Sequence, residues 1–172
     1  VGIGGAGMGG IAEVISHLGY AVTGSDMAAS GMTERLKDLG CTIKIGHAAE
    51  NISGANVVVV SSAVNDENPE VVEARANGIP VVPRAEMLAE IMRFSNGIAV
   101  AGTHGKTTTV GMIAGGFKSA EFDATVFIGS TLPEFDNQNF HAGSNDWLLV
   151  EACEYRNNFQ FLEPEIVVLT NA

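Results

Sequence analysis

The chain has 172 residues, of which 46% are hydrophobic and 17% are charged, and its formal net charge is −11. This length allows one large domain, or one domain and part of a second. An acidic chain disfavours a groove for the nucleic-acid backbone, which needs clustered Lys and Arg. No apolar run reaches the roughly 20 residues of a membrane helix. We therefore expect a soluble globular protein that binds neither nucleic acid nor a membrane.

The cysteines and the ends of the chain indicate where the protein works. Cys41 and Cys153 lie far apart and form no C-x-x-C pair, which favours a reducing cytoplasm over a disulfide framework or a zinc site. The sequence begins VGIGGAG, inside a predicted strand, without the charged start of a secretory signal, and it ends at the tip of another predicted strand. We expect a cytoplasmic protein and interpret the sequence as part of a longer chain.

Short β-branched runs alternate with helical patterns along the chain, which predicts an α/β fold with parallel sheets. Helices are expected over IAEVISHLG, TERLKDL, EVVEARAN, RAEMLAEIMRF and TTTVGMIAGG. Asn68 reads as the N-cap of the third of these helices, Pro69 as its first residue and Gly78 as its stop. The strands are expected at 1–3, 20–23, 42–45, 57–61, 80–82, 97–101, 125–128, 147–151 and 166–169.

The fourth predicted helix ends in RFSNG, before a new strand, and there we place a domain boundary near Ser95. Residues 1–95 then form a Rossmann-like domain with a parallel sheet. Residues 96–172 form the first part of a P-loop α/β ATPase domain. The polar, turn-rich segment TLPEFDNQNFHAGSN inside the second domain is predicted to be a loop.

The first glycine-rich loop has the pattern G-x-G-x-x-G. Gly2, Gly4 and Gly7 follow the first predicted strand and precede a helix, and Asp26 follows at the end of the second strand. Such a loop lets a diphosphate approach a helix N-terminus, while the acidic residue accepts hydrogen bonds from a ribose or a base. Alternatively, the glycines only allow close packing of strand and helix, and Asp26 caps a turn.

The second loop, AGTHGKTTT, lies between the strand GIAVA and a helix. Its backbone N–H groups are expected to surround phosphates, with Lys106 on the β and γ oxygens and the Thr107 hydroxyl on Mg²⁺. Val100 stands where the common P-loop pattern has its first glycine, so the loop is a shortened variant. The alternatives are a Gly-Lys-Thr turn at a helix start and, for His104, either a backbone role or a proton role.

A carboxylate from a neighbouring strand is the expected second partner of Mg²⁺. Glu151 ends the apolar strand WLLVE and is the better candidate, because Mg²⁺ prefers carboxylate oxygen. Glu154 follows one helical turn later and either joins it or lies in solvent. Cys153 is expected to be a packed side chain, since no basic residue beside it in the sequence would activate it.

Together these segments resemble the Mur ligase family. The segments that carry the resemblance, in chain order, are GIGGAGMGGIAEV, GSD, SSAV, PRAEMLAEIM, AGTHGKTTT, EACEYRNNF and VVLTN. They cover nearly the whole sequence. GTHGKTTT with PRAEML resembles the subgroup that acts on UDP-N-acetylmuramate. The resemblance implies that the first domain binds a UDP-sugar and not a dinucleotide, and that the second belongs to the central ATPase domain.

The resemblance also implies site residues. Those for the UDP-sugar are Gly4, Ala6, Gly7, Met8, Asp26, His47, Ser61 and Ser62. Those for ATP are Gly102, Thr103, His104, Gly105, Lys106, Thr107, Thr108 and Asn171, with Thr107 and Glu151 on Mg²⁺. Arg84 is either a surface charge or a helper near the substrate phosphates. Asn139 and His141 either lie near the sugar nucleotide or hold their own loop.

The implied reaction is ATP-dependent ligation of L-alanine to UDP-N-acetylmuramate through an acyl phosphate, in peptidoglycan synthesis. Lys106, Glu151 and Mg²⁺ would act by positioning and by neutralising charge. Since the C-terminal domain of the family and the rest of the central domain are missing from the sequence, we expect no ligation by these residues alone, but weak binding of the UDP-sugar.

Three other functions stay open. A recycling ligase that joins UDP-N-acetylmuramate to a tripeptide shares both loops, although EACEYR favours the alanine ligase. An NAD-dependent oxidoreductase would use GIGGAG and Asp26 but leaves GTHGKTTT unexplained. A non-catalytic nucleotide-binding module would keep both loops without the reaction. The sequence does not indicate an oligomeric state.

Overall fold

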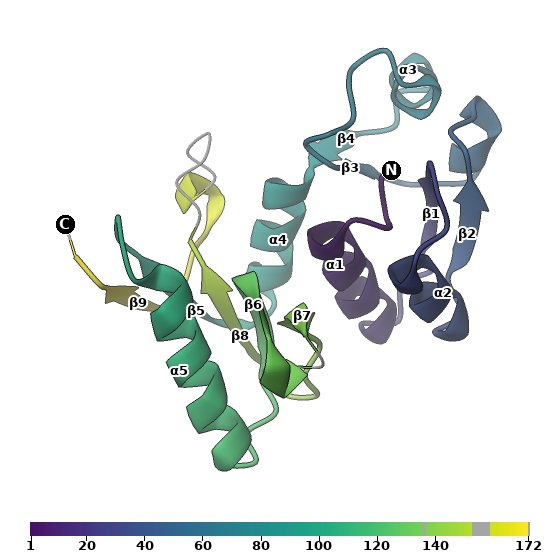
Figure 1. Cartoon of the computed structure of the whole chain (residues 1–172). Coiled ribbons are helices and arrows are strands. Elements are labelled where there is room, and N and C mark those ends of the chain that lie inside the picture. Colours follow the sequence, from purple (N-terminus) through teal and green to yellow (C-terminus); the bar gives the residue numbers. More distant parts are fainter. Residues whose placement is uncertain (136, 153–158, 172) are drawn as a thin grey trace. The chain divides into compact units, whose positions relative to one another are not determined.

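The computed structural model describes residues 1–135, 137–152 and 159–171. The chain forms two compact units, Val1–Met87 and Leu88–Ala172 (Figure 1). The division falls inside helix α4 (Arg84–Arg93), a few residues before the boundary expected near Ser95. Each unit has its own apolar core.

The first unit contains two small parallel sheets. In one, β1 (Thr23–Asp26) pairs with β2 (Thr42–Ile45); in the other, β3 (Val58–Val60) pairs with β4 (Val81–Pro83). The helices are α1 (Ala6–His17), α2 (Gly31–Asp38) and α3 (Pro69–Ala76), with a short 3₁₀ helix, η1 (Ala49–Ile52). Asn68 caps α3 through Glu70 N and Pro69 is its first residue, as predicted.

Residues 1–3, predicted to be a strand, make backbone hydrogen bonds to two strand segments but do not form a regular strand. The Val1 nitrogen donates to Val59 O and Val1 O accepts from Ser61 N, while Gly2 and Ile3 both donate to Ser25 O. Gly2 has φ +75°, which ends the extended backbone there. Residues 1–3 therefore lie between β1 and β3 and connect the two small sheets.

The strand predicted at 20–23 is wrong by three residues, because the paired segment is β1, TGSD. Its composition is polar, yet Ser25 is buried, and its hydroxyl donates to the buried carboxylate of Glu70. Tyr20, an aromatic residue that favoured a strand at 20–23, is exposed. The apolar signal therefore came from residues before β1, of which Val22 O accepts a hydrogen bond from Thr42 N.

The second unit is a five-stranded sheet in the order β7-β6-β8-β5-β9. The strands are β5 (Asn96–Ala101), β6 (Thr125–Leu132), β7 (Gln138–His141), β8 (Trp147–Glu151) and β9 (Ile166–Leu169). All neighbours pair in parallel except β7, which is antiparallel to β6. Helix α5 (Lys106–Ser119) packs against β5, β6 and β8, as Figure 1 shows.

The prediction of a loop over TLPEFDNQNFHAGSN is wrong where strands enter the segment, at 131–132 and 138–141. Strand β6 continues to Leu132, a 3₁₀ turn, η2 (Pro133–Phe135), follows, and β7 returns along β6. Phe140 is the physical reason, because its buried ring stacks on Phe127 with 6.3 Å between the ring centroids. One buried aromatic side chain in a polar segment is a weak signal in the sequence.

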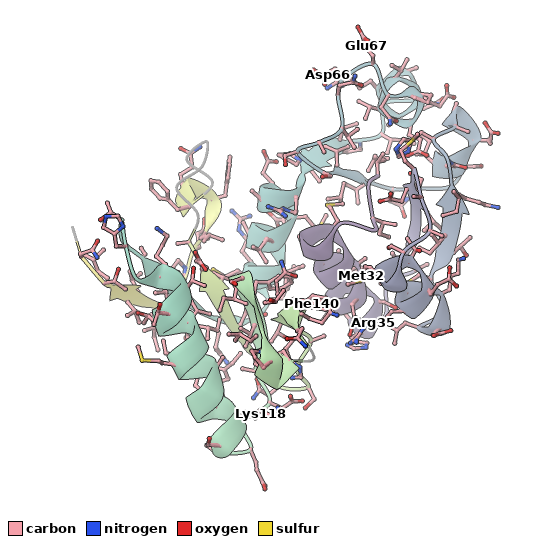
Figure 2. The ribbon with its side chains drawn as sticks, viewed as in Figure 1. Met32, Arg35, Asp66, Glu67, Lys118 and Phe140 are labelled. Atoms are coloured by element: carbon pink, nitrogen blue, oxygen red, sulfur yellow. The ribbon has the colours of Figure 1, made fainter. Side chains whose placement is uncertain are left out.

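A half-buried ion pair connects α1 to α2: the Arg35 side chain is 46% exposed, whereas Glu13 is buried. The Glu13 side chain is 3% exposed, and both its oxygens accept hydrogen bonds from the Arg35 guanidinium at 2.7 and 2.8 Å. The helices approach closely here, since a Cβ at Gly9 would overlap the Met32 side chain. Figure 2 labels Met32 and Arg35 on α2. The first unit therefore depends on keeping Glu13 paired.

We expect Arg35→Met to lower the free energy of unfolding of the first unit by about 2 kcal/mol, between the values for exposed and for buried ion pairs. Methionine keeps the apolar stem but leaves the Glu13 carboxylate buried without its cation. Lys37→Met is the matched control on the same helix, because Lys37 pairs with Glu34 in solvent. It should change stability by less than about 0.5 kcal/mol. Urea denaturation followed by amide signals of residues 1–87 measures both; equal effects would contradict the account.

Candidate nucleotide-binding sites

The loop between β5 and α5 requires glycine at two positions. Gly102 has φ +132° and Gly105 has φ +82°, both in the left-handed region that glycine tolerates best. A Cβ at Gly102 would also overlap Thr170 Oγ1. Gly105 is the N-cap of α5, so the first turn of that helix, with its unpaired N–H groups, begins at Lys106. This is the geometry of an anion-binding loop.

Asn171 holds the loop in this shape. Its Oδ1 accepts from Thr103 N (2.9 Å), Thr103 Oγ1 (2.6 Å) and His104 N (3.2 Å), and its Nδ2 donates to His104 O (2.9 Å). Thr170 adds a hydrogen bond from its hydroxyl to His104 O. The side chain predicted to contact ATP therefore also fixes the backbone of the phosphate loop.

Lys106 lies along the loop and not in the core. Its side chain is half-buried, and Nζ donates to Gly102 O. Thr108 is exposed on the first turn of α5, as are Thr103 and His104 within the loop. The Lys106 ammonium is thus held in the loop whose backbone N–H groups are predicted to bind phosphates.

Thr107 and Glu151 meet where α5 begins and β8 ends. Thr107 Oγ1 lies 2.9 and 3.0 Å from the two Glu151 carboxylate oxygens, and Gly129 N donates to Glu151 Oε2 at 2.8 Å. The pairing of β5 with β8 sets Glu151 beside Val100, two residues before the loop. A Cβ at Gly129 would lie 2.8 Å from Glu151 Oε2, so only glycine leaves the carboxylate this position.

These donors fit Mg²⁺. A carboxylate and a hydroxyl are hard oxygen ligands, and Mg²⁺ commonly takes one or two protein ligands together with substrate phosphates and waters. Among residues 1–135, 137–152 and 159–171, no group of three or more His, Cys, Asp and Glu side chains could hold a metal by itself. Glu154 and Cys153 lie outside the residues that the structure describes.

The residues predicted for the UDP-sugar gather at the carboxyl ends of strands in the first unit. Gly4 N donates to Asp26 Oδ2 at 2.8 Å, and a Cβ at Gly2 would lie 3.0 Å from Ser61 Cβ. Ala6 begins α1, and Gly7 and Met8 follow in its first turn. The Met8 side chain is buried, so only its backbone can face a ligand there, whereas Ser62 is exposed.

Arg84 reaches the first turn of α1, because a Cβ at Gly7 would overlap Arg84 Nη1. Its side chain is exposed and, in the part of the chain that the structure describes, has no acidic partner. In a chain of net charge −11, an Arg that is not paired with a carboxylate is available to an anion. This position favours the second of the two predicted roles, a helper near the substrate phosphates.

His47 belongs to a buried network that sequence reasoning missed. Ser25 Oγ lies 3.1 Å from His47 Nδ1 and donates to Glu70 Oε2 at 2.6 Å, and Asn51 Nδ2 donates to Glu70 Oε1 at 2.6 Å. In the sequence, Glu70 follows an Asn-Pro helix start, where an acidic residue is ordinary because of the helix dipole. No sequence signal distinguishes it from such a residue.

Asn139 and His141 lie on β7. His141 Nε2 is 2.7 Å from Asp123 Oδ1, and its ring stacks on Phe135. The pKa of Asp123 is lowered, first by the hydrogen bond to His141 and then by that to Ser144. Asn139 Oδ1 is buried and has no hydrogen-bond partner among the described residues. For His141 these contacts favour the structural alternative.

The fold and the two glycine loops define an α/β protein with two candidate phosphate-binding loops, and comparison with known sequences identifies its family. The model of the Mur ligase family, catalytic domain, matches residues 1–96. Because this match covers more than half of the sequence, the chain belongs to the Mur ligase family.

Curated relatives and solved structures are similar over nearly the whole chain. The chain is 55% identical over 171 residues to the UDP-N-acetylmuramate–L-alanine ligase of Laribacter hongkongensis and 53% identical to that of Dechloromonas aromatica, and covers 36% and 37% of their lengths. The UDP-N-acetylmuramate–alanine ligase structure from Thermotoga maritima has a TM-score of 0.83 at 32% identity, over 99% of this chain and 40% of that one. A murein peptide ligase from Psychrobacter arcticus has a TM-score of 0.83 at 29% identity, over 98% and 41%.

The chain thus spans a little over a third of the length of these curated relatives. Among the residues that the structure describes, no helix is long and apolar enough to cross a membrane.

We expect Asn171→Ala to speed amide hydrogen exchange at Thr103 and His104 by about tenfold, because both amides lose their acceptor. Asn77→Ala is the control, since among the described residues the Asn77 side chain hydrogen-bonds only to Glu73. Exchange measured by NMR should be unchanged in the loop of the control. Equal protection of Thr103 and His104 in Asn171→Ala and in the wild type would show that Asn171 does not hold the loop.

Proposed function

We propose that the chain is the front part of a cytoplasmic, ATP-dependent ligase that joins L-alanine to UDP-N-acetylmuramate in peptidoglycan synthesis. The observation that carries the proposal is the second loop, where Gly102, Gly105 and Lys106 form a phosphate-binding turn and Thr107 meets Glu151 behind it. An enzyme that binds only a dinucleotide has no use for this second arrangement. The names of the relatives at 51–55% identity support the choice of alanine.

In this proposal residues 96–172 bind ATP. The loop amides and Lys106 hold the phosphates, Asn171 and Thr170 keep the loop in shape, and Thr107 with Glu151 holds Mg²⁺. Mg²⁺ held there would neutralise the charge that develops on the transferred phosphoryl group. In that transfer the lactyl carboxylate attacks the γ-phosphorus of ATP and ADP leaves, which gives the acyl phosphate. The side chains act by position and charge, so none of them has to be a nucleophile.

Residues 1–95 bind the sugar nucleotide in the same proposal. The amides at the start of α1 and the Arg84 guanidinium face the diphosphate. The Asp26 carboxylate accepts from Gly4 N with Oδ2, which fixes the glycine loop, and from Ala28 N at 3.4 Å with Oδ1. Oδ1 can accept a second hydrogen bond, from a ribose hydroxyl. Ser61 and Ser62 add hydroxyls at the end of β3. Ligation itself needs the remaining length that the relatives have.

A ligase that recycles a tripeptide is the second candidate. The ligase from Neisseria meningitides that takes L-alanyl-γ-D-glutamyl-meso-diaminopimelate has a TM-score of 0.81 at 30% identity, over 99% of this chain and 58% of that one. Both candidates share UDP-N-acetylmuramate and ATP. The amine substrate separates them, so a full-length form of the protein should be assayed with L-alanine and with the tripeptide.

Binding measurements on two variants test whether the loops have separate ligands. We expect Lys106→Met to weaken MgATP binding about tenfold to a hundredfold, which is the value of one charge-assisted hydrogen bond. The affinity of this variant for UDP-N-acetylmuramate should stay within about twofold of the wild type. Arg84→Met should do the reverse, weakening UDP-N-acetylmuramate about tenfold. Arg75→Met on α3 is the control, because Arg75 pairs with Asp66 in solvent.

Isothermal titration calorimetry of the 172-residue chain and of its three variants gives the affinities for MgATP and UDP-N-acetylmuramate, with NAD as a third ligand. Tighter binding of NAD than of UDP-N-acetylmuramate would favour the oxidoreductase and contradict the proposal. Absence of heat with millimolar UDP-N-acetylmuramate would contradict it as well.

A further inference from the structure

Glu70 is a buried acidic residue to which the proposed reaction gives no role. Its side chain is 1% exposed and lies in the first turn of α3. Among the described residues, its carboxylate accepts from the Ser25 hydroxyl at 2.6 Å, the Asn51 amide at 2.6 Å and the Ala48 N–H at 3.4 Å, and His47 Nδ1 lies 3.6 Å from its Oε2. Asn51 Nδ2 also donates to Gly46 O, so its NH₂ group faces two acceptors. Both carboxylate oxygens of Glu70 therefore accept hydrogen bonds, Oε2 from Ser25 and Oε1 from Asn51 and Ala48.

The direction of the hydrogen bonds determines which nitrogen of His47 carries the proton. Ser25 has one hydroxyl proton and donates it to Glu70 Oε2. The hydrogen bond between Ser25 Oγ and His47 Nδ1, 3.1 Å long, must then be donated by His47. In the neutral ring, a proton on Nδ1 leaves Nε2 as an acceptor.

His47 stands at the edge where the sugar nucleotide is proposed to bind. It follows β2, and Gly46 N donates to Asp26 O, so the two strand ends are adjacent. The His47 side chain is 14% exposed, and its Nε2 has no hydrogen-bond partner within the described residues. An acceptor is thus left at the carboxyl ends of the strands, beside the carboxylate that holds the glycine loop.

We propose that Glu70 acts through Ser25 as a positioning residue that fixes His47 with its proton on Nδ1, so that Nε2 accepts a hydrogen bond from the nucleoside of the bound UDP-sugar. The diphosphate offers no donor, so the partner is a ribose hydroxyl or the imide N–H of the base. This inference rests on the proposed binding of a UDP-sugar, but the proton arrangement exists without the ligand.

NMR of the ligand-free chain tests the proton arrangement at about pH 8, where a histidine of ordinary pKa is neutral. The ring ¹⁵N signals of His47 should show N–H character at Nδ1 and a bare nitrogen at Nε2. In Glu70→Gln the amide oxygen has to face Asn51 and Ala48, so its NH₂ group faces Ser25. Ser25 then donates to His47, and the two ring signals should exchange character.

Glu67→Gln is the matched control. It removes the same charge from the loop before α3, where Glu67 is exposed and labelled in Figure 2. It should leave the tautomer of His47 unchanged. A purely structural role of Glu70 would alter stability but would not reverse the ring. A proton on Nε2 in the wild type, or an unchanged ring in a folded Glu70→Gln variant, overturns the proposal; if Glu70→Gln does not fold, the wild-type spectrum decides.

Calorimetry tests the ligand contact separately. Glu70→Gln should bind UDP-N-acetylmuramate about tenfold more weakly, because His47 Nε2 then carries a proton and faces a donor of the nucleoside. Glu67→Gln should bind it with an affinity within about twofold of the wild type. Wild-type affinities for UDP, 2′-deoxy-UDP and 3-methyl-UDP show whether a hydroxyl or the imide N–H is the donor. If Glu70→Gln has the exchanged His47 tautomer but binds UDP-N-acetylmuramate as tightly as the wild type, the proposed contact of Nε2 is overturned. A wild-type chain with the expected tautomer that fails to bind UDP-N-acetylmuramate overturns the proposed function instead, and with it the contact.

Discussion

The pairing of β8 with β5 is the constraint on which the phosphate site depends. Parallel strands deliver their carboxyl ends to one edge of a sheet, and the register sets Glu151 beside Val100 just before the loop begins. The glycines of the loop and the start of α5 then bring the Thr107 hydroxyl to that carboxylate. Two segments far apart in the sequence, 96–107 and 147–151, therefore meet at this edge of the sheet.

In both units, one side chain with several hydrogen bonds holds polar groups in fixed positions at the ends of strands. In the second unit the Asn171 side chain makes four hydrogen bonds to polar groups of the loop, three accepted by Oδ1 and one donated by Nδ2. In the first unit the buried Glu70 accepts hydrogen bonds from Ser25, Asn51 and Ala48 N. A fully paired polar network inside a protein restricts its members to one arrangement. Such networks suit sites that have to be formed before a ligand arrives.

Most of the fold could be predicted because helix starts and apolar strands have local signals. Asn68 and Pro69 begin α3, and WLLVE forms β8 over the predicted residues. The failures have a common cause: burial by a distant partner. The segment TGSD is a strand because Glu70 satisfies Ser25, and QNFH is a strand because Phe127 covers Phe140. The two glycine loops were predicted from the spacing of their residues between a strand and a helix, and their ligands stay predictions. The contacts of Glu70, Gly129 and Thr170 are contained in no local pattern.

The central claim is that two glycine loops in one chain bind two different phosphates, a sugar-nucleotide diphosphate and a triphosphate with its metal. The most direct measurement is a two-ligand NMR titration of one ¹⁵N-labelled sample. UDP-N-acetylmuramate should move the amide signals of residues 2–8, and MgATP those of residues 102–108, with neither ligand displacing the other. Competition between the ligands, or movement of the same loop by both, would contradict the account.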